Sequence, residues 1–308
     1  MNGKKIWELV KTSFKEWKED KASRLAAAMA YYTVFSIAPL LIITLGIAGW
    51  FFDKTVAQSQ LIAQFSSLIG RQGAEIIQTM LESAGKPTDS LIASIIGLVT
   101  LFWGASGVFN AMQDALNTIW EVAPKPGRSL MGIIKNRTLL FSMVLVIGFL
   151  LLVLLVVSTS LSAVTAYFSG NVETISVMLQ VINFVVSFGI TTLLFALIFK
   201  IIPDVEIAWR NVWVGAAITS LLFSVGKFAI GAYLGNGSIT TAYGAAGSLV
   251  VILVWVYYSA QILFLGAEFT QVYTNMHSAH PPPKPNAVPL TERARAQQGL
   301  PDSQKIKQ

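Results

Sequence analysis

Three ionisable side chains stand inside long apolar segments and are the first candidates for chemistry. Lys227 lies in "LLFSVGKFAIGAYLG", Asp114 lies in "NAMQDALN" and Glu268 follows "FLGA". A charge held within a membrane-spanning helix is costly, and such residues mark ion, proton or ligand sites more often than not. These three positions therefore focus the search for a site.

Lys227 has two interpretations. At ~1.5 Å per residue it lies about 22 Å from the inner boundary of its apolar segment and about 9 Å from the outer one, far from both acids. It either extends to the outer interface, towards Asp89 or Glu173, or faces an outward polar cavity and holds an anionic headgroup. In the second interpretation Tyr233, in the same stretch, belongs to the binding site.

Asp114 and Glu268 lie at a similar depth near the inner ends of their segments. Four amide side chains accompany them: Asn110, Gln113, Asn117 and Gln261. The acids either pair with Arg24 or Lys21 and fix the helix ends, or form an inner polar vestibule in which a buried carboxyl carries a proton. A catalytic carboxylate pair would require the second and sixth apolar segments to touch, and nothing identifies a reaction for it.

Other residue types offer little for catalysis. The chain has no cysteine and only two histidines, His277 and His280, in its polar tail. A zinc nuclease needs a cluster of histidine and aspartate ligands. No phosphate-binding loop, dinucleotide fingerprint or nucleophile elbow occurs. We therefore expect that the protein binds no metal or cofactor and is not an enzyme.

The elements that position these residues follow from composition. Hydrophobic residues make up 54% of the 308 positions and charged residues 12%, about half the usual globular share. The mean hydropathy is +0.62. These values predict an all-α, polytopic membrane protein. Six segments are long enough to cross a bilayer, at roughly 26–52, 90–112, 138–162, 175–202, 212–234 and 247–272.

The basic residues predict the orientation. Eighteen of the 22 Lys and Arg lie in the N-terminal segment, in the alternate loops and in the tail, while the opposite loops hold Lys54, Arg71 and Lys86. The asymmetry predicts that both termini are cytoplasmic. It also accounts for the net charge of +6 without a nucleic-acid partner.

The chain then divides into three parts. Residues 1–23 contain an amphipathic surface helix, whose stripe is Ile6, Trp7, Val10, Phe14 and Trp17. This helix lies on the inner membrane surface, packs on the bundle, or does both. Residues 24–274 form the six-helix domain, with two short helices in the outer loop at about 53–88. Residues 275–308 are polar and proline-rich, which predicts disorder.

Proline and glycine predict local features of the bundle. Pro39 removes a backbone hydrogen bond and predicts a kink in the first span. Gly231 and Gly235 form a GxxxG pattern, and Gly104 and Gly107 lie close to Ser106 in the second span. Small residues at such spacing predict close helix contacts or hinges.

Four stretches together resemble the YihY/BrkB family of bacterial inner-membrane proteins. They are "RLAAAMAYYTVFSIAPLL", "FWGASGVFNAMQDALNTIWEV", "KIIPDVEIAWRNVWVGA" with the later "GKFAIGAYL", and "YGAAGSLVVILVWVYYSAQILFLGAEF". The resemblance implies six membrane helices in the bacterial inner membrane. Members have been labelled virulence factors or ribonuclease BN, and some resemble candidates for lipid export. The histidine-poor sequence argues against ribonuclease activity.

The leading hypothesis is a protein that binds or translocates an amphipathic, anionic envelope molecule such as a lipid. Its partners would be membrane lipids, with a homo-oligomer or an unidentified membrane partner also open. The alternative is a membrane scaffold without transport, which would use the N-terminal helix and the tail as contacts.

Overall fold

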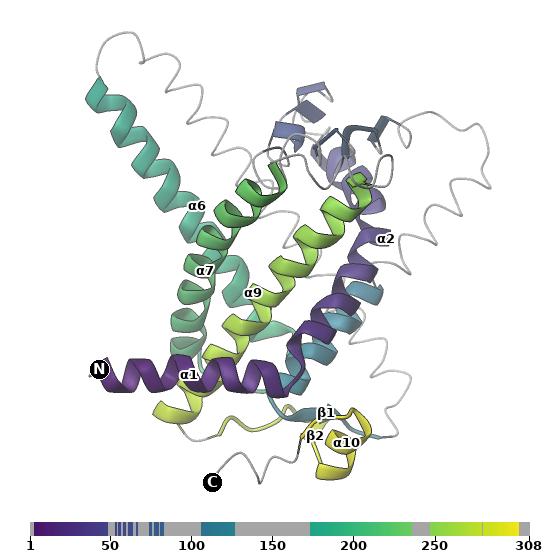
Figure 1. The fold of residues 1–308 in the computed structure, drawn as a ribbon, viewed down its shortest axis with the longest axis vertical. Coiled ribbons are helices and arrows are strands. Elements are labelled where there is room, and N and C mark those ends of the chain that lie inside the picture. Colours follow the sequence, from purple (N-terminus) through teal and green to yellow (C-terminus); the bar gives the residue numbers. More distant parts are fainter. Residues whose placement is uncertain are drawn as a thin grey trace, which may run out of the picture.

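The computed structural model describes residues 3–48, separate positions between 53 and 82, and residues 106–126, 173–235, 247–278 and 280–301. Most of these are helical. The long helices are α1 (Gly3–Glu19), α2 (Ala22–Ala48), α6 (Glu173–Ile201), α7 (Trp209–Gly235) and α9 (Gly247–His277). A further helix covers 106–119. The short elements are β1 (Val122–Pro124), β2 (Ala287–Pro289) and α10 (Glu292–Gln297), as Figure 1 shows.

Three of the described helices, α6, α7 and α9, are long and apolar enough to cross a membrane. Their apolar windows are Val181–Ile201, Trp209–Ala232 and Leu249–His277. These agree with the last three predicted spans. Residues 138–162 lie outside the described residues, so the total of six spans stays a prediction. The fold is mostly helical, with one two-stranded sheet of three-residue strands that the sequence did not predict.

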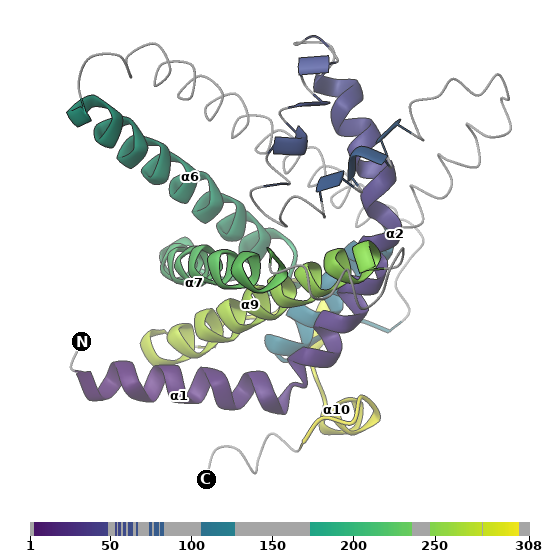
Figure 2. The same ribbon diagram turned by 45° about the horizontal axis from the view of Figure 1, so that its top comes forward.

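The helices α7 and α9 run in opposite directions and pack through two reciprocal glycine–threonine contacts. A Cβ built on Gly215 would lie 1.8 Å from Oγ1 of Thr270, and one on Gly266 would lie 2.0 Å from Oγ1 of Thr219. Each threonine hydroxyl donates 2.7 Å to the glycine carbonyl one turn earlier in its own helix. The missing side chains thus let the two backbones approach closely. The helix α6 packs on α7 near one end and diverges from it towards the other (Figure 2).

The helix α1 lies across the end of this bundle and packs on α9 (Figure 1). Its bundle-facing side chains include Leu9 and Ser13, which are buried. Most of the predicted apolar stripe lies on a different face, since Trp7 is 71% exposed and Phe14 55% exposed, while Trp17 of the same stripe packs on the core. The helix therefore packs on the bundle and also presents an apolar face outward, so the two interpretations are compatible.

The described positions from 55 to 82 are all helical, as expected for this loop. Leu61, Ile77 and Leu81 are buried in one apolar cluster. The same cluster contains Ala30 of α2 and Ile252 near the start of α9. This segment therefore covers the bundle end opposite α1.

The prediction of a disordered tail is wrong for residues 280–301. The strand β2 pairs antiparallel with β1, with Ala123 opposite Val288. The carbonyl of Pro282 accepts from the Glu206 amide at 3.0 Å. Prolines lack an amide donor but keep their carbonyls, and here the bundle end provides the partners. Composition alone does not reveal such long-range contacts.

The glycine predictions have mixed outcomes. A Cβ on Gly107 would meet the Tyr32 ring at 2.5 Å, so the predicted close contact is present there. Nothing described lies within 4 Å of a Cβ on Gly231, so the close contact predicted there is absent from the described part of the chain. Pro39 lies within the continuous helix α2, and the kink stays a prediction. Gly104 and the surroundings of Gly235 lie outside the described positions.

Candidate functional site

Lys227 is half-buried on α7, and no hydrogen-bond or ion-pair partner for it lies among the described residues. The helix α7 is continuous from Trp209, so Lys227 is ~27 Å along it, at ~1.5 Å per residue. Glu268 lies ~14 Å along α9 from the end of that helix at His277. The two helices are antiparallel, so the lysine is far from this acid, as predicted.

The position of Lys227 around α7 can be assigned from its neighbours. At ~100° per residue, Ser220, Ser224, Lys227 and Gly231 form one stripe along the helix. Phe223, adjacent to this stripe, contacts Phe195 of α6 with 5.7 Å between ring centroids. Phe223 also contacts Trp255 of α9, with 6.5 Å between ring centroids, so the stripe lies beside a part of α7 that meets both α6 and α9. The Ser220 hydroxyl is buried without a hydrogen-bond partner among the described residues.

Glu268 is completely buried on α9, with 0% of its surface exposed. Neither carboxyl oxygen has a hydrogen-bond partner in the part of the chain that the structure describes. One turn further on, Gln271 donates 2.9 Å to the Ile119 carbonyl, where the 106–119 helix ends. Glu268 thus belongs to the face of α9 that packs against this helix end.

Arg295 of the tail lies at the same end and is 2% exposed. Its Nη2 is 3.3 Å from Oδ1 of Asp20, and its Nη1 is 3.2 Å from Oε1 of Glu121. Its Nε donates 3.1 Å to the Pro301 carbonyl. All three nitrogens are therefore used, and the guanidinium joins the α1–α2 junction to the turn before β1.

Asp20 is the most perturbed group of this end outside the apolar helices. Burial raises its pKa from the ordinary 3.8 to about 7, the Arg295 guanidinium acts in the opposite direction, and Glu16 and Glu121 reinforce the increase. Burial also raises the pKa of Glu16. We name the set Glu16, Asp20, Glu121, Glu268 and Arg295 the acidic end cluster.

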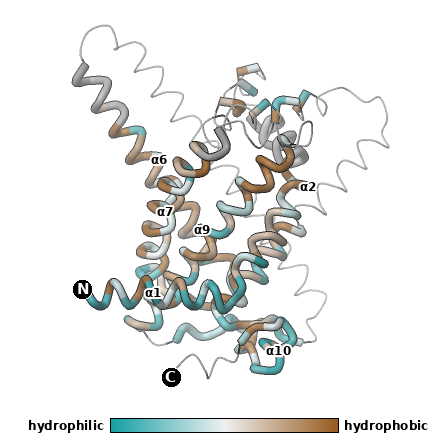
Figure 3. Tube along the Cα trace, viewed as in Figure 1, coloured by the Kyte–Doolittle hydropathy of each residue, from teal (hydrophilic) through white to brown (hydrophobic). Residues whose placement is uncertain are grey.

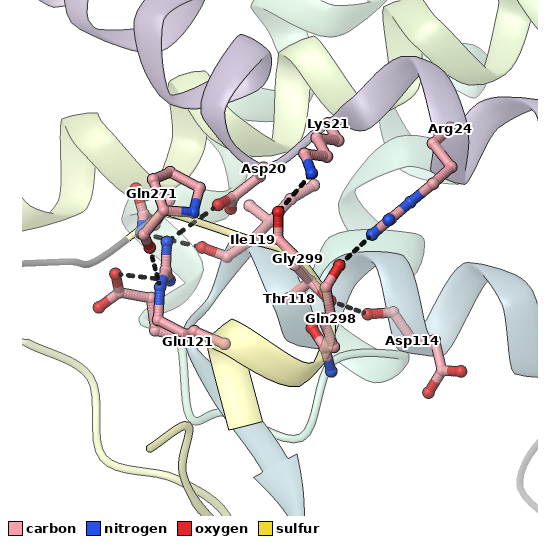
Figure 4. Close-up of polar contacts among 12 residues, drawn as sticks. Asp20, Lys21, Arg24, Asp114, Thr118, Ile119, Glu121, Gln271, Gln298 and Gly299 are labelled. Atoms are coloured by element: carbon pink, nitrogen blue, oxygen red, sulfur yellow. Dashed lines mark hydrogen bonds and ion pairs between the residues drawn. The ribbon is translucent and has the colours of Figure 1, made fainter. Parts of the chain in front are cut away.

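Asp114 does not join this cluster. Its side chain is exposed and points away from the dashed network in Figure 4, while its carbonyl accepts from the Thr118 hydroxyl at 2.8 Å. Lys21 and Arg24 bind tail carbonyls, at Gly299 and Gln298. The expected pairing of the acids with these two bases is therefore wrong among the described contacts.

The amides have separate surroundings. Asn110 is exposed and Gln261 is half-buried. Gln113 and Asn117 donate to the Asp204 carboxylate at 3.3 and 3.1 Å, and the Asp204 amide donates 2.8 Å to Oδ1 of Asn117. These two amides thus fix the buried loop between α6 and α7 instead of lining a vestibule.

Sequence reasoning missed Asp204, Asp20, Glu121 and Arg295. Asp204 follows a proline in "KIIPDVEI", and its burial depends on a partner 87 residues away. Arg295 lies 275 residues from Asp20. No local sequence pattern indicates which residues so far apart in the chain come into contact. Glu268 was identified from the sequence because few other charges occur in its apolar segment, but the residues around it were not. The backbone of Tyr233 is helical, and its side chain lies outside the described positions.

Comparison with known proteins identifies the family. The family model described as "Virulence factor BrkB" matches residues 13–291, almost the whole chain. The chain belongs to the BrkB family. This membership agrees with the resemblance seen in the sequence. No match was found among solved structures.

Relatives of this BrkB-family protein are named as membrane proteins. A UPF0761 membrane protein of Mannheimia succiniciproducens is 26% identical over 271 residues, covering 84% of this chain and 87% of the relative. One of Tolumonas auensis is 27% identical, covering 82% and 80%. One of Alkalilimnicola ehrlichii is 26% identical, covering 83% of this chain, which spans only 56% of that relative. With three apolar helices of spanning length, the chain is a membrane protein.

The histidines of this BrkB-family chain have ordinary contacts. Nδ1 of His277 lies 2.9 Å from the Tyr273 carbonyl, and its ring stacks on the Tyr273 ring with centroids 4.3 Å apart. No group of three or more metal-binding side chains occurs among the described residues. That no metal or nucleic acid is bound stays a prediction.

Proposed function

We propose that this protein binds, and moves between membrane leaflets, an amphipathic anionic molecule of the bacterial inner membrane such as a phospholipid. Lys227 is the proposed headgroup site. The observation that carries the proposal is that Lys227 is half-buried in an apolar helix with no polar partner among the described residues. A lysine in that setting is stabilised by an anion that arrives with its own apolar chains.

The surroundings of Lys227 support a lipid over a small soluble anion. Phe228, the residue after Lys227, is 81% exposed on α7 and is suited to contact acyl chains. The Ser220 hydroxyl, on the Lys227 stripe two helical turns nearer α1, is buried and has no hydrogen-bond partner among the described residues. The chain shows no ATP-binding motif, so movement would be passive, ion-coupled or driven by a partner.

The test uses the full chain purified into nanodiscs of mixed neutral and anionic phospholipid. We expect Lys227→Met to lose co-purified anionic lipid and to slow flipping of a fluorescent phosphatidylglycerol in vesicles by at least about tenfold, the equivalent of ~1.4 kcal/mol. Lys227→Arg should retain most of both. Arg210→Met, which removes an exposed charge near the start of the same helix, should change neither.

Equal lipid binding and flipping in the wild type and Lys227→Met would overturn the proposal. A scaffold without transport predicts that outcome, together with loss of function when residues 1–20 and 277–308 are deleted. The same proposal has three further parts: both termini are cytoplasmic, the protein forms a homo-oligomer, and it catalyses no reaction.

A further inference from the structure

A second site is indicated at the other end of the bundle. Glu268 is fully enclosed, and neither of its oxygens meets a donor within the described residues. An ionised carboxylate in such a place costs several kcal/mol, whereas the neutral acid loses only its hydrogen bonds to water. The group is therefore held as the acid unless a cation approaches.

The charged groups around Glu268 come from three separate segments. Glu16 and Asp20 belong to α1 and the junction after it, Glu121 belongs to the turn before β1, and Arg295 belongs to α10. Gln271, one turn after Glu268, binds the Ile119 carbonyl two residues before Glu121, so Glu268 lies at the same end as these groups. Four carboxyl groups thus share one buried guanidinium, with Lys15 beside Glu16 as a further cation. Without bound protons this end would hold an excess of buried negative charge.

The carboxyl groups of the cluster differ in their exposure to solvent. The Glu121 side chain is 34% exposed, that of Asp20 is 5% exposed and Glu268 is not exposed. Arg295 bridges the first two. The exposure of the carboxyl groups therefore decreases from Glu121 through Asp20 to Glu268.

We propose that Glu268 and Asp20 form a proton-binding site that exchanges with solvent past Glu121, with Arg295 of the folded tail as its counter-charge. Each site proton comes from bulk water, binds a carboxylate oxygen and returns to water on release. The site lies far from Lys227 and stands whether or not a lipid binds there.

A proton fits this cluster better than a metal cation. The guanidinium of Arg295 already pairs with one oxygen of Asp20 and one of Glu121, and its positive charge disfavours a metal cation beside it. The described residues contain no group of three or more metal-binding side chains. A proton needs no coordination shell and no space beyond an oxygen lone pair.

The test is an infrared titration of the full chain in nanodiscs. We expect the wild type at pH 7 to show the carbonyl-stretch band of a protonated carboxyl in dry surroundings, shifted in D₂O and lost at higher pH. Glu268→Gln, nearly isosteric, should lose a band that Glu206→Gln keeps, since Glu206 is an exposed acid of the same end. A wild type without the band, or an unchanged band in Glu268→Gln, overturns the proposal.

A second variant keeps the test decisive if Glu268→Gln does not fold. Glu16→Gln removes a neighbouring negative charge without breaking the ion pairs of Arg295. The band should then be lost at a lower pH than in the wild type. An unmoved transition contradicts the proposal, as does a band that disappears on adding sodium at constant pH, which would assign the site to a metal cation. Lipid flipping is measured separately, so failure here leaves the Lys227 proposal unaffected.

Discussion

Arg295 is the residue on which the folded tail depends. A buried guanidinium is tolerated only when its donors are paired, and here Asp20, Glu121 and the Pro301 carbonyl use all three nitrogens. Removing one member of a buried ion pair costs about 3–5 kcal/mol, because the other charge stays buried and unpaired. Arg295 therefore links the tail to the α1–α2 junction, in addition to the hydrogen bonds that Lys21 and Arg24 donate to tail carbonyls.

Arg295→Ala should release the tail from the bundle. We expect hydrogen exchange of the amides in β2 and α10 to accelerate by roughly 100-fold or more, as loss of ~3 kcal/mol implies. Hydrogen–deuterium exchange mass spectrometry in detergent measures it. Arg293→Ala is the matched control, since Arg293 is exposed on the same short helix. Equal protection in both variants would show that the strands and the Lys21 and Arg24 hydrogen bonds hold the tail without Arg295.

Tail docking should also depend on pH through Asp20. The docked state has a raised pKa of about 7 against the ordinary 3.8, so it retains a proton that the undocked state releases between these values. The resulting stabilisation is complete below about pH 4 and is lost as the pH rises through about 7. Glu16 acts in the same direction. Amide protection in β2, corrected for intrinsic exchange, should fall from pH 5 to pH 8, and Asp20→Asn should flatten this dependence. Protection that rises with pH would contradict the assignment.

The sequence located ionisable residues but not their partners. Lys227 and Glu268 stand out because few charges occur in apolar helices, and the structure leaves both unpartnered among the described residues. Asp114 stands out equally and proves to be exposed. The sequence did not show which groups approach from distant parts of the chain. Arg295 binds Asp20, and Asp204 binds Gln113.

At the scale of elements, glycine spacing predicted the type of helix contact, and its location at Gly107, but not the glycine contacts between α7 and α9. The GxxxG pair that includes Gly231 was the obvious candidate, yet open space surrounds Gly231 among the described residues. Gly215 and Gly266 make the close contacts instead, each against a threonine on the opposite helix. A spacing pattern cannot tell which face of a helix meets a neighbour. Only the structure shows that Gly215 makes a close contact and that Gly231 makes none among the described residues.

Two matched glycine-to-alanine variants test this packing. Gly215→Ala places a methyl group 1.8 Å from Oγ1 of Thr270 and should lower stability by about 1–3 kcal/mol. Gly231→Ala places the same group in open space and should be neutral or stabilise α7 by up to about 1 kcal/mol. Thermal unfolding in detergent compares them. A stable Gly215→Ala protein would mean that α7 and α9 can separate without loss.

The three faces of α1 suit a position at the membrane surface. At ~100° per residue, the buried Leu9 and Ser13 face the bundle, the exposed stripe of Trp7, Val10 and Phe14 lies beside them, and Lys11 lies beyond. Figure 3 shows the hydrophilic residues concentrated at this end. Apolar and basic faces side by side are typical of helices that lie on anionic lipid.

A fluorescent label can test this position, because the chain has no cysteine of its own. Val10→Cys and Lys11→Cys are labelled with an environment-sensitive dye in nanodiscs. We expect blue-shifted emission at position 10 and water-like emission at position 11, as the stripe enters the lipid interface and the lysine face does not. Similar spectra at the two positions would place α1 away from the membrane.

At the scale of the whole molecule, the two ends of the bundle differ in character. The α1 end carries α1, the β1–β2 sheet, α10 and the acidic end cluster (Figure 1). The opposite end is covered by the helical positions between 55 and 82. The sequence predicted this polarity from its basic residues, whereas the folded tail came only from the structure. The proposed lipid and proton sites therefore lie at different depths of one bundle.

The orientation of this bundle in the membrane can be decided with single cysteines. Lys5 on α1 and Gln297 on α10 are exposed at the α1 end, and Thr79 is exposed near the opposite end. The excess of basic residues at the α1 end predicts that it faces the cytoplasm. A membrane-impermeant maleimide should therefore label Thr79→Cys in intact spheroplasts, and should label Lys5→Cys and Gln297→Cys only after lysis. Labelling of positions 5 and 297 on different sides would contradict both the orientation and the packing of the tail on the α1 end, while labelling of both before lysis would reverse the orientation and place Lys227 nearer the cytoplasm.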